Sequence, residues 1–291
     1  MPDALHDVGL VARTDRVEAL PAIELLARRL VSRGVRLRVE NMCHQQIPVG
    51  EPGDLDFVVG ADLVFALGGD GTILWVAREA AALGTPVLGV DLGSFGFLAE
   101  EEPDAVLDSL DDILAGNYLL EDRLMLEASL MRGDEPVGQH LALNDIVVAK
   151  ITYRHLVLLH CEVDGSPLAT YRADGLIVAT PTGSTAYNLS AGGPIVDPRV
   201  EAMLITAICP HTLYSRPLVI DADTVLELWV EPKPGRVDDL QLTVDGQEGH
   251  ELGSDTRIVI RRAKCRARLA HSRRRVFFDR LRDKLNWGAP R

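Results

Sequence analysis

The first 120 residues alternate short, continuously apolar runs with longer segments in which apolar residues recur every three or four positions. Short apolar runs favour buried strands, and the longer period favours helices. The predicted strands lie at residues 8–13, 35–40, 62–67 and 85–90, and the predicted helices at 17–34, 72–83 and 103–116. This alternation is typical of a parallel sheet with helices on its faces. We therefore expect an α/β domain over residues 1–120.

The pattern changes at residue 121, where short β-rich runs follow one another with turn signals between them. Asp164-Gly165 and Asp245-Gly246 are dipeptides that favour tight hairpins. These features predict an all-β domain of antiparallel strands over residues 121–271. Residues 272–291 regain a helical period. Because a single helix needs a surface to pack on, we expect it to return to the first domain.

Composition limits the classes of protein to consider. The 291 residues are 47% hydrophobic and 25% charged, as in a soluble globular protein. No apolar run approaches the roughly 20 residues of a membrane helix, and the first residues lack the pattern of a secretory signal. The net charge of −13 disfavours nucleic-acid and membrane partners. The four cysteines form no CxxC pair, which argues against a zinc site and against disulfides. We expect a cytoplasmic protein.

A glycine turn joins the predicted strand at 62–67 to the helix that follows it. Gly68, Gly69 and Gly71 permit close approach of a ligand to backbone N–H groups, and Thr72 opens a helix whose N-terminus favours an anion. A carboxylate repels phosphate, so Asp70 fits this turn as a ligand to Mg²⁺ or as a base for a hydroxyl that attacks phosphorus. The alternative is that Asp70 simply caps the helix near Thr72.

Two later segments carry polar groups suited to a nucleotide. The apolar strand at 176–179 runs into Pro-Thr-Gly-Ser-Thr, whose donors suit phosphate or ribose oxygens. A serine-rich and threonine-rich turn without a ligand is the alternative. Asn144 and Asp145 interrupt an apolar strand, where they could hold a ribose diol. A bulge or a strand-end hydrogen bond is the alternative for that pair.

Six short segments, taken in order, resemble bacterial NAD kinases. They are GGDGT (68–72), LND (143–145), RADG (172–175), TPTGSTAYNLSAGGP (180–194), PHTL (210–213) and DGQ (245–247). GGDGT is also found in diacylglycerol and sphingosine kinases, whereas the long TPTGSTAY segment is far more specific. The resemblance implies a Rossmann-like α/β domain joined to a β-sandwich domain. It also implies a homodimer or homotetramer.

The resemblance further implies transfer of a phosphoryl group to the 2′-hydroxyl of the adenosine ribose of NAD, which gives NADP. The donor would be ATP or polyphosphate, with Mg²⁺ or another divalent metal. Asp70 would be the general base. The rest of the turn would bind the cofactor through Gly68, Gly69, Gly71 and Thr72. No side chain is assigned as a metal ligand.

The same resemblance assigns the dinucleotide site. Asn144 and Asp145 would hold ribose or adenine groups, and Gln247 would complete the pocket. His155, Arg172 and Asp174 would line the site, the last two from a partner subunit. The adenine and ribose wall would consist of Thr185, Ala186, Tyr187, Asn188, Leu189 and Ser190.

One position departs from the pattern of the family. Trp75 stands where bacterial relatives often have arginine, a basic group that could neutralise phosphate. Two other functions remain open at this point. A lipid kinase would share GGDGT but has no reason to carry TPTGSTAY or DGQ. A non-catalytic dinucleotide sensor would use Asp70 only as a helix cap.

Overall fold

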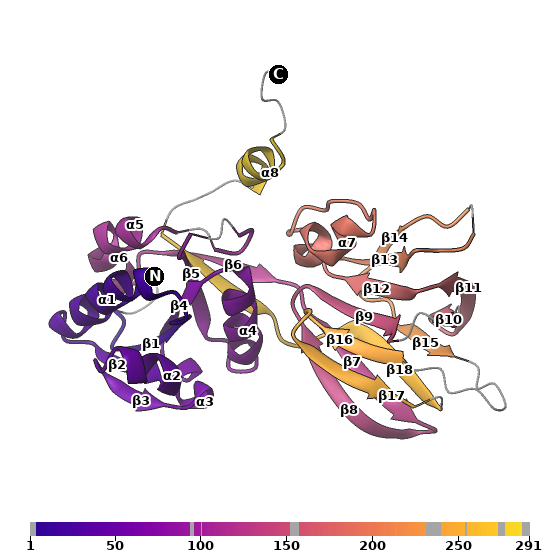
Figure 1. Ribbon diagram of the computed structural model, residues 1–291, viewed down its shortest axis with the longest axis horizontal. Helices are drawn as coiled ribbons and strands as arrows, with labels where there is room; N and C mark the ends of the chain where they lie inside the picture. Colours follow the sequence, from indigo (N-terminus) through magenta and orange to yellow (C-terminus); the bar gives the residue numbers. More distant parts are fainter. Residues whose placement is uncertain are drawn as a thin grey trace. The chain divides into compact units, whose positions relative to one another are not determined.

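The computed structural model describes residues 4–93, 96–99, 101–151, 157–212, 214–230, 240–253, 255–272 and 277–286. The chain forms two compact units (Figure 1). The first consists of residues 1–122 and 266–291, and the second of residues 123–265.

The first unit is built on a seven-stranded sheet in the order β3-β2-β1-β4-β5-β19-β6. Its strands are β1 (Asp7–Ala12), β2 (Arg36–Glu40), β3 (Glu51–Gly53), β4 (Leu63–Gly68), β5 (Pro86–Asp91), β6 (Leu119–Arg123) and β19 (Ala267–His271). Pairing is parallel from β3 through to β19. Every residue of β4 is buried, as expected for a central strand covered on both faces. The expected Rossmann-like parallel-sheet domain is confirmed.

The helices of this unit follow the predicted alternation with strands. They are η1 (Val17–Ala19), α1 (Leu20–Ser32), α2 (Asn41–Gln46), α3 (Leu55–Val59), α4 (Asp70–Ala81), α5 (Pro103–Asp108), α6 (Leu110–Leu114) and α8 (Phe277–Leu285). The single helix predicted at 103–116 is two short helices that meet at Ser109. The hydroxyl of Ser109 donates to the carbonyl of Ala105 at 2.7 Å, a local bond that competes with the helical ladder.

The strand order places the glycine turn at a defined point of this sheet. The chain winds outward from β1 through β2 to β3, and then resumes at β4 on the other side of β1. In open parallel sheets ligands bind beyond the carboxyl ends of the strands at such a reversal of order. The GGDGT turn follows β4 directly, so the topology puts Asp70 at this reversal.

The boundary between the units differs from the expected one in a single strand. The sequence pattern assigned residues 267–271 to the β domain. In the structure these residues form β19, which pairs in parallel with β5 of the first unit, with Leu269 beside Val87. Alternation of apolar and polar residues identifies a strand, but it does not say which sheet the strand joins. Helix α8 follows in the same unit.

The second unit is a β-sandwich of two six-stranded antiparallel sheets, as expected. One sheet has the order β11-β10-β15-β18-β7-β8, with β7 (Leu126–Arg132), β8 (Glu135–Ala142), β10 (Val157–Val163), β11 (Ser166–Ala173), β15 (Leu226–Val230) and β18 (Thr256–Arg262). The other has the order β14-β13-β12-β9-β16-β17, with β9 (Asp145–Lys150), β12 (Gly175–Ala179), β13 (Ala202–Ile208), β14 (Leu218–Asp221), β16 (Leu240–Val244) and β17 (Glu248–Leu252). Buried residues of both sheets, such as Leu228 and Val178, form one core.

Turns in this unit confirm the predicted hairpins. Asp164 and Gly165 have φ of 48° and 72°, and Asp245 and Gly246 have φ of 52° and 66°. Two successive residues at positive φ form the turn whose twist matches a hairpin. Short helices η2 (Thr182–Thr185) and α7 (Tyr187–Ser190) follow β12.

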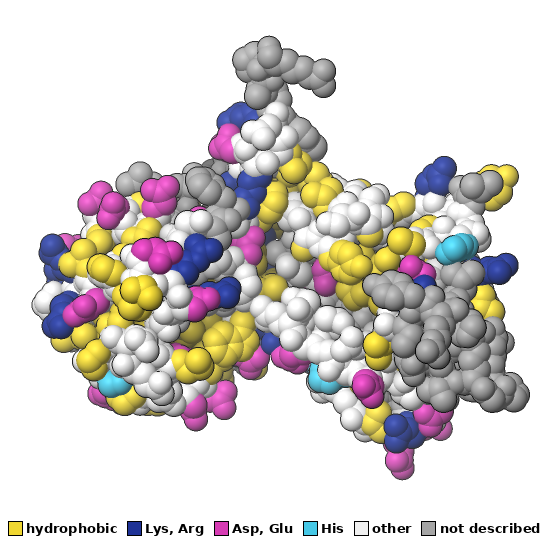
Figure 2. All heavy atoms as spheres, in the orientation of Figure 1, with side chains coloured by type: hydrophobic (Ala, Val, Ile, Leu, Met, Phe, Trp, Pro, Cys, Tyr) yellow, Lys and Arg dark blue, Asp and Glu magenta, His cyan; other side chains and the backbone are white. Residues whose placement is uncertain are grey.

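The surface shows charges of both signs. Figure 2 shows acidic and basic side chains interspersed over the face of the first unit, where Arg33 pairs with Asp111 at 2.7 Å and Arg36 with Glu51 at 2.6 Å. Within the described part of the chain, no helix is both long and apolar enough to cross a membrane.

Candidate functional site

The Asp70 carboxylate is held by backbone N–H groups of a neighbouring loop. Phe97 donates to Oδ2 at 2.6 Å, and Leu98 and Ala99 donate to Oδ1 at 2.8 and 3.1 Å. This loop follows β5, the strand that pairs with β4, so the two turns leave the sheet side by side. The carboxylate is therefore fixed in position by main-chain donors.

The helix-cap explanation of Asp70 is wrong. Helix α4 begins at Asp70 itself, two residues earlier than the expected start at Thr72, and Gly69 is the N-cap residue. No side chain caps this helix, and the Asp70 carboxylate turns away from it toward residues 97–99. The backbone donors of residues 97–99 orient this carboxylate, which takes no part in starting the helix.

Gly96 leaves the space that the carboxylate occupies. A Cβ atom on Gly96 would lie 1.6 Å from Oδ1 of Asp70, which no side chain could tolerate. The loop at 96–99 was missed in the sequence analysis. Gly93 and Gly96, which follow the predicted strand at 85–90, were the available sequence signal for this loop. Neighbouring parallel strands end at the same edge of a sheet, so a glycine-containing turn after that strand is expected beside the GGDGT turn.

Hydrogen-bond capacity distinguishes the two oxygens of Asp70. An ionised carboxylate offers about four acceptor positions, two on each oxygen. Oδ1 accepts two N–H groups, and Oδ2 accepts one. Within the described residues, Oδ2 therefore has the larger remaining acceptor capacity, and the side chain is only half-buried.

Helix α8 brings positive charge to the same loop. Arg280 donates to the carbonyl oxygen of Phe97, and Nζ of Lys284 lies 4.4 Å from the centre of the Phe97 ring. Partial burial lowers the pKa of the Lys284 ammonium, while the carboxylates of Asp70 and Asp91 act to raise it. Lys284 therefore lies within the electrostatic field of Asp70.

In the second unit, hydrogen bonds to Asp245 connect the LND segment to the DGQ segment. Its carboxylate accepts the N–H groups of Leu143 at 3.1 Å, Asn144 at 2.7 Å and Asp145 at 3.1 Å. The N–H of Asp245 donates in return to the carbonyl of Asp145 at 2.9 Å. Residues 143 and 144 connect β8 of one sheet to β9 of the other, so this carboxylate fixes the point where the chain changes sheets.

Thr180 and Gly183 join the TPTG turn to the same point. The Thr180 hydroxyl donates to the carbonyl of Leu143 at 2.6 Å and accepts the N–H of Gly183 at 3.1 Å. The N–H of Thr180 donates to the carbonyl of Asn144 at 2.9 Å. A Cβ atom on Gly183 would lie 2.1 Å from that carbonyl oxygen, so the close approach requires glycine. LND, TPTG and DGQ thus form one corner of the second unit.

Asp145 is the buried carboxyl of this corner. Its side chain is 3% exposed. Burial, with a smaller contribution from the charge of Asp245, raises its pKa from 3.8 to about 7. A carboxyl with a pKa near neutrality changes its charge readily when a ligand supplies or removes hydrogen-bond donors.

The predicted site residues 185–190 and Gln247 differ in whether a ligand could reach their side chains. Tyr187 is 46% exposed, so its ring is available to a ligand. Thr185, Ala186 and Leu189 are half-buried, and Ser190 and Gln247 are exposed. Asn188 is fully buried and bonds the carbonyls of Ser184 and Pro194 and the hydroxyl of Thr206. Asn188 therefore shapes the segment from within, which differs from the expected place in the wall of the pocket.

Comparison with known proteins identifies the family. The ATP-NAD kinase N-terminal domain matches residues 55–118, and the ATP-NAD kinase C-terminal domain matches residues 143–272. The chain belongs to the ATP-NAD kinase family. The NAD kinase of Thermoanaerobacter sp. (strain X514) is 46% identical over 283 residues, 97% of this chain and 99% of that protein. The NAD kinase of Moorella thermoacetica is 41% identical over 288 residues, 99% of this chain and 91% of that protein.

Solved structures agree with this assignment. The yeast NADH kinase complexed with NADH has a TM-score of 0.87 at 26% identity, over 99% of this chain and 90% of that one. An NAD kinase from Archaeoglobus fulgidus in complex with ATP has a TM-score of 0.74 at 25% identity, over 96% of this chain and 98% of that one. This chain is thus a phosphotransferase that acts on NAD, and the lipid-kinase alternative is not favoured.

Two residues that the family resemblance assigns to the dinucleotide site, Arg172 and Asp174, lie near the end of β12 opposite to Thr180. Asp174 precedes β12 and pairs with Lys150 at 2.5 Å, whereas Thr180 follows the same strand. Six residues of strand span about 20 Å. Arg172 is exposed on β11 near the Asp174 end. Neither residue joins the LND corner of its own chain. His155 lies outside the described residues.

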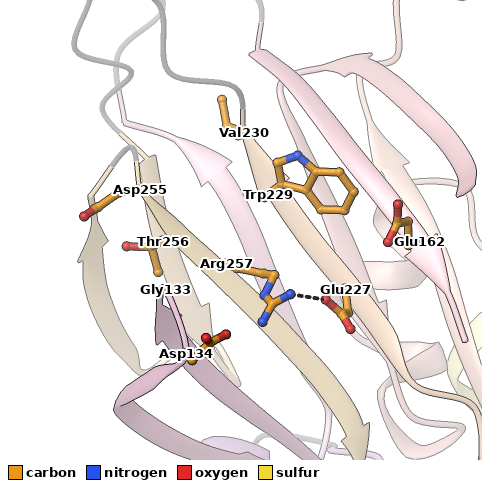
Figure 3. A pocket seen from close by; sticks show the side chains of 9 residues that line it. All are labelled: Gly133, Asp134, Glu162, Glu227, Trp229, Val230, Asp255, Thr256 and Arg257. Atoms are coloured by element: carbon orange, nitrogen blue, oxygen red, sulfur yellow. Dashed lines mark ion pairs between the residues drawn. The ribbon is translucent and has the colours of Figure 1, made fainter. Parts of the chain in front are cut away.

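A hollow on the second unit has the wrong chemistry for a nucleotide. Its volume is about 500 Å³, and it opens on the outer face of the sheet that contains β15 and β18 (Figure 3). Among the described residues, its lining includes Asp134, Glu162, Glu227 and Asp255 and one basic side chain, Arg257, which pairs with Glu227 at 3.1 Å. Four carboxylates repel phosphate groups, so these residues do not form a phosphate site.

Proposed function

We propose that this kinase transfers the terminal phosphoryl group of ATP to the 2′-hydroxyl of the adenosine ribose of NAD, with Asp70 as the general base. The observation that carries the proposal is the Asp70 carboxylate, which is fixed by three main-chain N–H donors and, among the described residues, accepts two of them on Oδ1 and one on Oδ2. The relatives support the substrates, since one solved neighbour is complexed with ATP and another with NADH.

The proposed reaction needs a proton acceptor because a ribose hydroxyl is almost un-ionised at neutral pH. Asp70 Oδ2 takes the 2′-hydroxyl proton as the oxygen bonds to phosphorus, and the bond from that phosphorus to the leaving ADP oxygen breaks. Positioning supplies much of the remaining rate in phosphoryl transfer. The three main-chain donors provide that positioning for Asp70, because backbone groups cannot rotate away as side chains do.

Neutralisation of the donor phosphates comes from two sources in this proposal. The N-terminus of α4 presents a positive dipole end, which favours an anion. Lys284 of α8 supplies a positive charge near Asp70. A divalent ion such as Mg²⁺ would further neutralise the phosphates, and the carboxylate oxygens of Asp70 and Asp91 are of the donor type that it prefers.

The corner formed by LND, TPTG and DGQ is proposed to hold the adenosine part of NAD. Asn144 and Asp145 supply acceptors for hydroxyl or amino groups, and Tyr187 supplies an exposed ring for the adenine. Arg172 and Asp174 are proposed to act in the site of a partner subunit. Asp174 lies at the opposite end of β12 from Thr180, and Arg172 lies two residues before Asp174 on β11, which supports this assignment.

The test is an assay for NADP with the purified chain, NAD, Mg²⁺ and one donor at a time. ATP, a second nucleoside triphosphate and inorganic polyphosphate are compared as donors, and NADH is compared with NAD as the acceptor. We expect NADP from NAD and ATP. If NAD binds but no donor gives product, the chain is a dinucleotide sensor and the proposal fails. Light scattering on the same sample gives the number of subunits.

A further inference from the structure

Three side chains with metal-binding groups meet where the two sheets of the sandwich come together at their edges. β8 is the last strand of one sheet, and β17 is the last strand of the other. His140 on β8 and Glu248 and His250 on β17 each place one ligand atom within 4.8 Å of the others. The two imidazole ring centres are 3.9 Å apart, with the rings inclined by 35°.

The alternation of each strand directs these side chains inward. Residues two apart on a strand share a face, so Glu248 and His250 lie on the same face of β17 as Leu252, which packs on the core. His140 shares its face of β8 with Ala142, which is fully buried. The three polar residues thus occupy positions at the rim of the core where apolar side chains are usual.

The nitrogen Nε2 of His250 adds a second, independent observation. It is buried, and among the residues that the structure describes it has no hydrogen-bond partner. The nearest charged oxygen is that of Glu248 at 3.7 Å, which is beyond hydrogen-bond distance. A buried nitrogen without a hydrogen-bond partner is unusual in a folded protein, and a bound metal ion would account for it.

We propose that His140, Glu248 and His250 bind one divalent transition-metal ion, preferably Zn²⁺. Two imidazoles and one carboxylate form a donor set that zinc uses in proteins, with water as the fourth ligand. Zinc ligands lie about 2.0–2.2 Å from the ion, so the donor atoms draw closer together on binding, which side-chain rotation on the two edge strands allows. Mg²⁺ prefers oxygen ligands, so this site is distinct from any magnesium bound with the donor phosphates.

The bound ion closes the sandwich at the corner that holds the LND and DGQ segments. β8 leads directly into residues 143–145, and β17 begins directly after residues 245–247. The ion therefore joins the two sheets next to the hydrogen bonds that Asp245 makes. Inward-facing polar side chains also protect edge strands from unwanted pairing without any metal. Binding measurements separate these two explanations.

The experiment uses the full-length chain, freed of metal with a chelator and dialysed into metal-free buffer. Co²⁺ is titrated as a spectroscopic substitute, and Zn²⁺ affinity is then measured by competition with a chromophoric chelator. We expect one ion per chain, the strong visible absorption of tetrahedral Co²⁺, and a melting temperature that rises with the concentration of Zn²⁺. No saturable binding, or binding that leaves the melting temperature unchanged, would overturn the proposal.

Variants locate the site. His140→Gln and His250→Gln are each expected to weaken Zn²⁺ binding by roughly a hundredfold, and Glu248→Gln by roughly tenfold or more. Even residues that only hydrogen-bond to a metal ligand change metal affinity by about tenfold to a hundredfold when they are mutated. Glu251→Gln is the matched control, since Glu251 lies on the same strand but faces outward and is exposed. Wild-type affinity in both histidine variants would place the metal elsewhere and overturn the proposal.

X-ray absorption on the zinc-loaded wild-type chain gives a result that does not depend on folding of the variants. We expect a first shell of nitrogen and oxygen with two imidazoles. Sulfur in that shell would assign the ion to cysteine, of which Cys209 is exposed, and would contradict the site.

Discussion

Asp70 and Asp245 lie in different units and are held in the same way. Each carboxylate accepts the N–H groups of three consecutive residues, 97–99 for Asp70 and 143–145 for Asp245. They differ in burial, because Asp245 is 7% exposed whereas Asp70 is half-buried. One arrangement therefore has two uses. In the first unit the backbone positions a carboxylate for the proposed proton transfer, and in the second a carboxylate positions the backbone of the proposed binding corner.

Asp70→Asn and Asp245→Asn test this difference most strongly. Each change replaces an acceptor oxygen by an NH₂ group that faces N–H donors, so each is expected to lower the free energy of unfolding by about 1–3 kcal/mol. Only Asp70→Asn removes the base, so kcat falls by roughly 10²-fold or more in that variant. Asp245→Asn is expected to act mainly on KM for NAD. Equal kcat values for the two variants would remove the distinction.

Gly96→Ala disturbs the anchored carboxylate without changing its chemistry. The added Cβ would overlap Oδ1 of Asp70 at 1.6 Å, so the carboxylate must move by an ångström or more. A displacement of that size costs roughly 10²-fold in kcat. Gly60→Ala is the control in the same unit, because its nearest atom is the flexible end of Arg38 at 3.1 Å. The prediction is wrong if Gly96→Ala keeps wild-type turnover.

The raised pKa of Asp145 gives the second unit a pH dependence near neutrality. A pKa near 7 leaves about a tenth of the carboxyl groups ionised at pH 6 and about nine-tenths at pH 8. If the carboxylate accepts donors from NAD, KM for NAD is expected to fall about tenfold from pH 6 to pH 8. Asp145→Asn removes this slope. A wild-type KM independent of pH would exclude the role.

Stability is expected to change with pH in the opposite direction. The folded-state pKa of Asp145 lies above its ordinary value of 3.8, so the folded chain holds this proton more tightly than the unfolded chain. The contribution of Asp145 to the free energy of unfolding is therefore largest below about pH 4 and is lost as the pH rises through about 7. Urea unfolding of the wild type and of Asp145→Asn measures the difference.

Tyr187→Ala tests whether the exposed ring belongs to the binding corner. Stacking of a base on an aromatic ring contributes about 1–3 kcal/mol, and the lower value applies to a ring that is 46% exposed. KM for NAD is expected to rise about fivefold, with little change in kcat. Tyr187→Phe keeps the ring and should retain most of the affinity. An unchanged KM in Tyr187→Ala would exclude contact with the adenine.

Lys284→Met tests the positive charge that α8 adds beside Asp70. The methionine keeps an apolar stem against the Phe97 ring and removes only the charge. A partly exposed charge contributes up to about 1 kcal/mol, so KM for ATP is expected to rise about two- to fivefold. Arg282→Met is the control, since Arg282 lies on the same helix and pairs with Asp279. Equal effects of the two changes would argue against a specific role.

Sequence patterns predicted the two domains because each kind of periodicity is local. Buried strands such as β4 read as continuous apolar runs, and the Asp-Gly dipeptides marked hairpins through their own backbone preferences. The motifs GGDGT, TPTG and DGQ were also found as local patterns. The sheet that β19 joins was predicted wrongly, because a partner strand far away in the sequence decides it.

The sequence by itself determined which side chains this kinase has for its chemistry. The residue types in the short motifs, which are carboxylates, hydroxyls and glycines, indicate that chemistry before any tertiary contact is known. Only the tertiary structure decided how each carboxylate is held. Asp70 could be a cap or a base until residues 97–99 were seen to hold it. The sequence does not distinguish Asp145 from Asp245. In the structure, burial raises the pKa of Asp145, whereas the carboxylate of Asp245 accepts backbone N–H groups and so anchors the chain. Hydrogen-bond donors and burial come from residues distant in the chain, and they set the properties of an ionisable group.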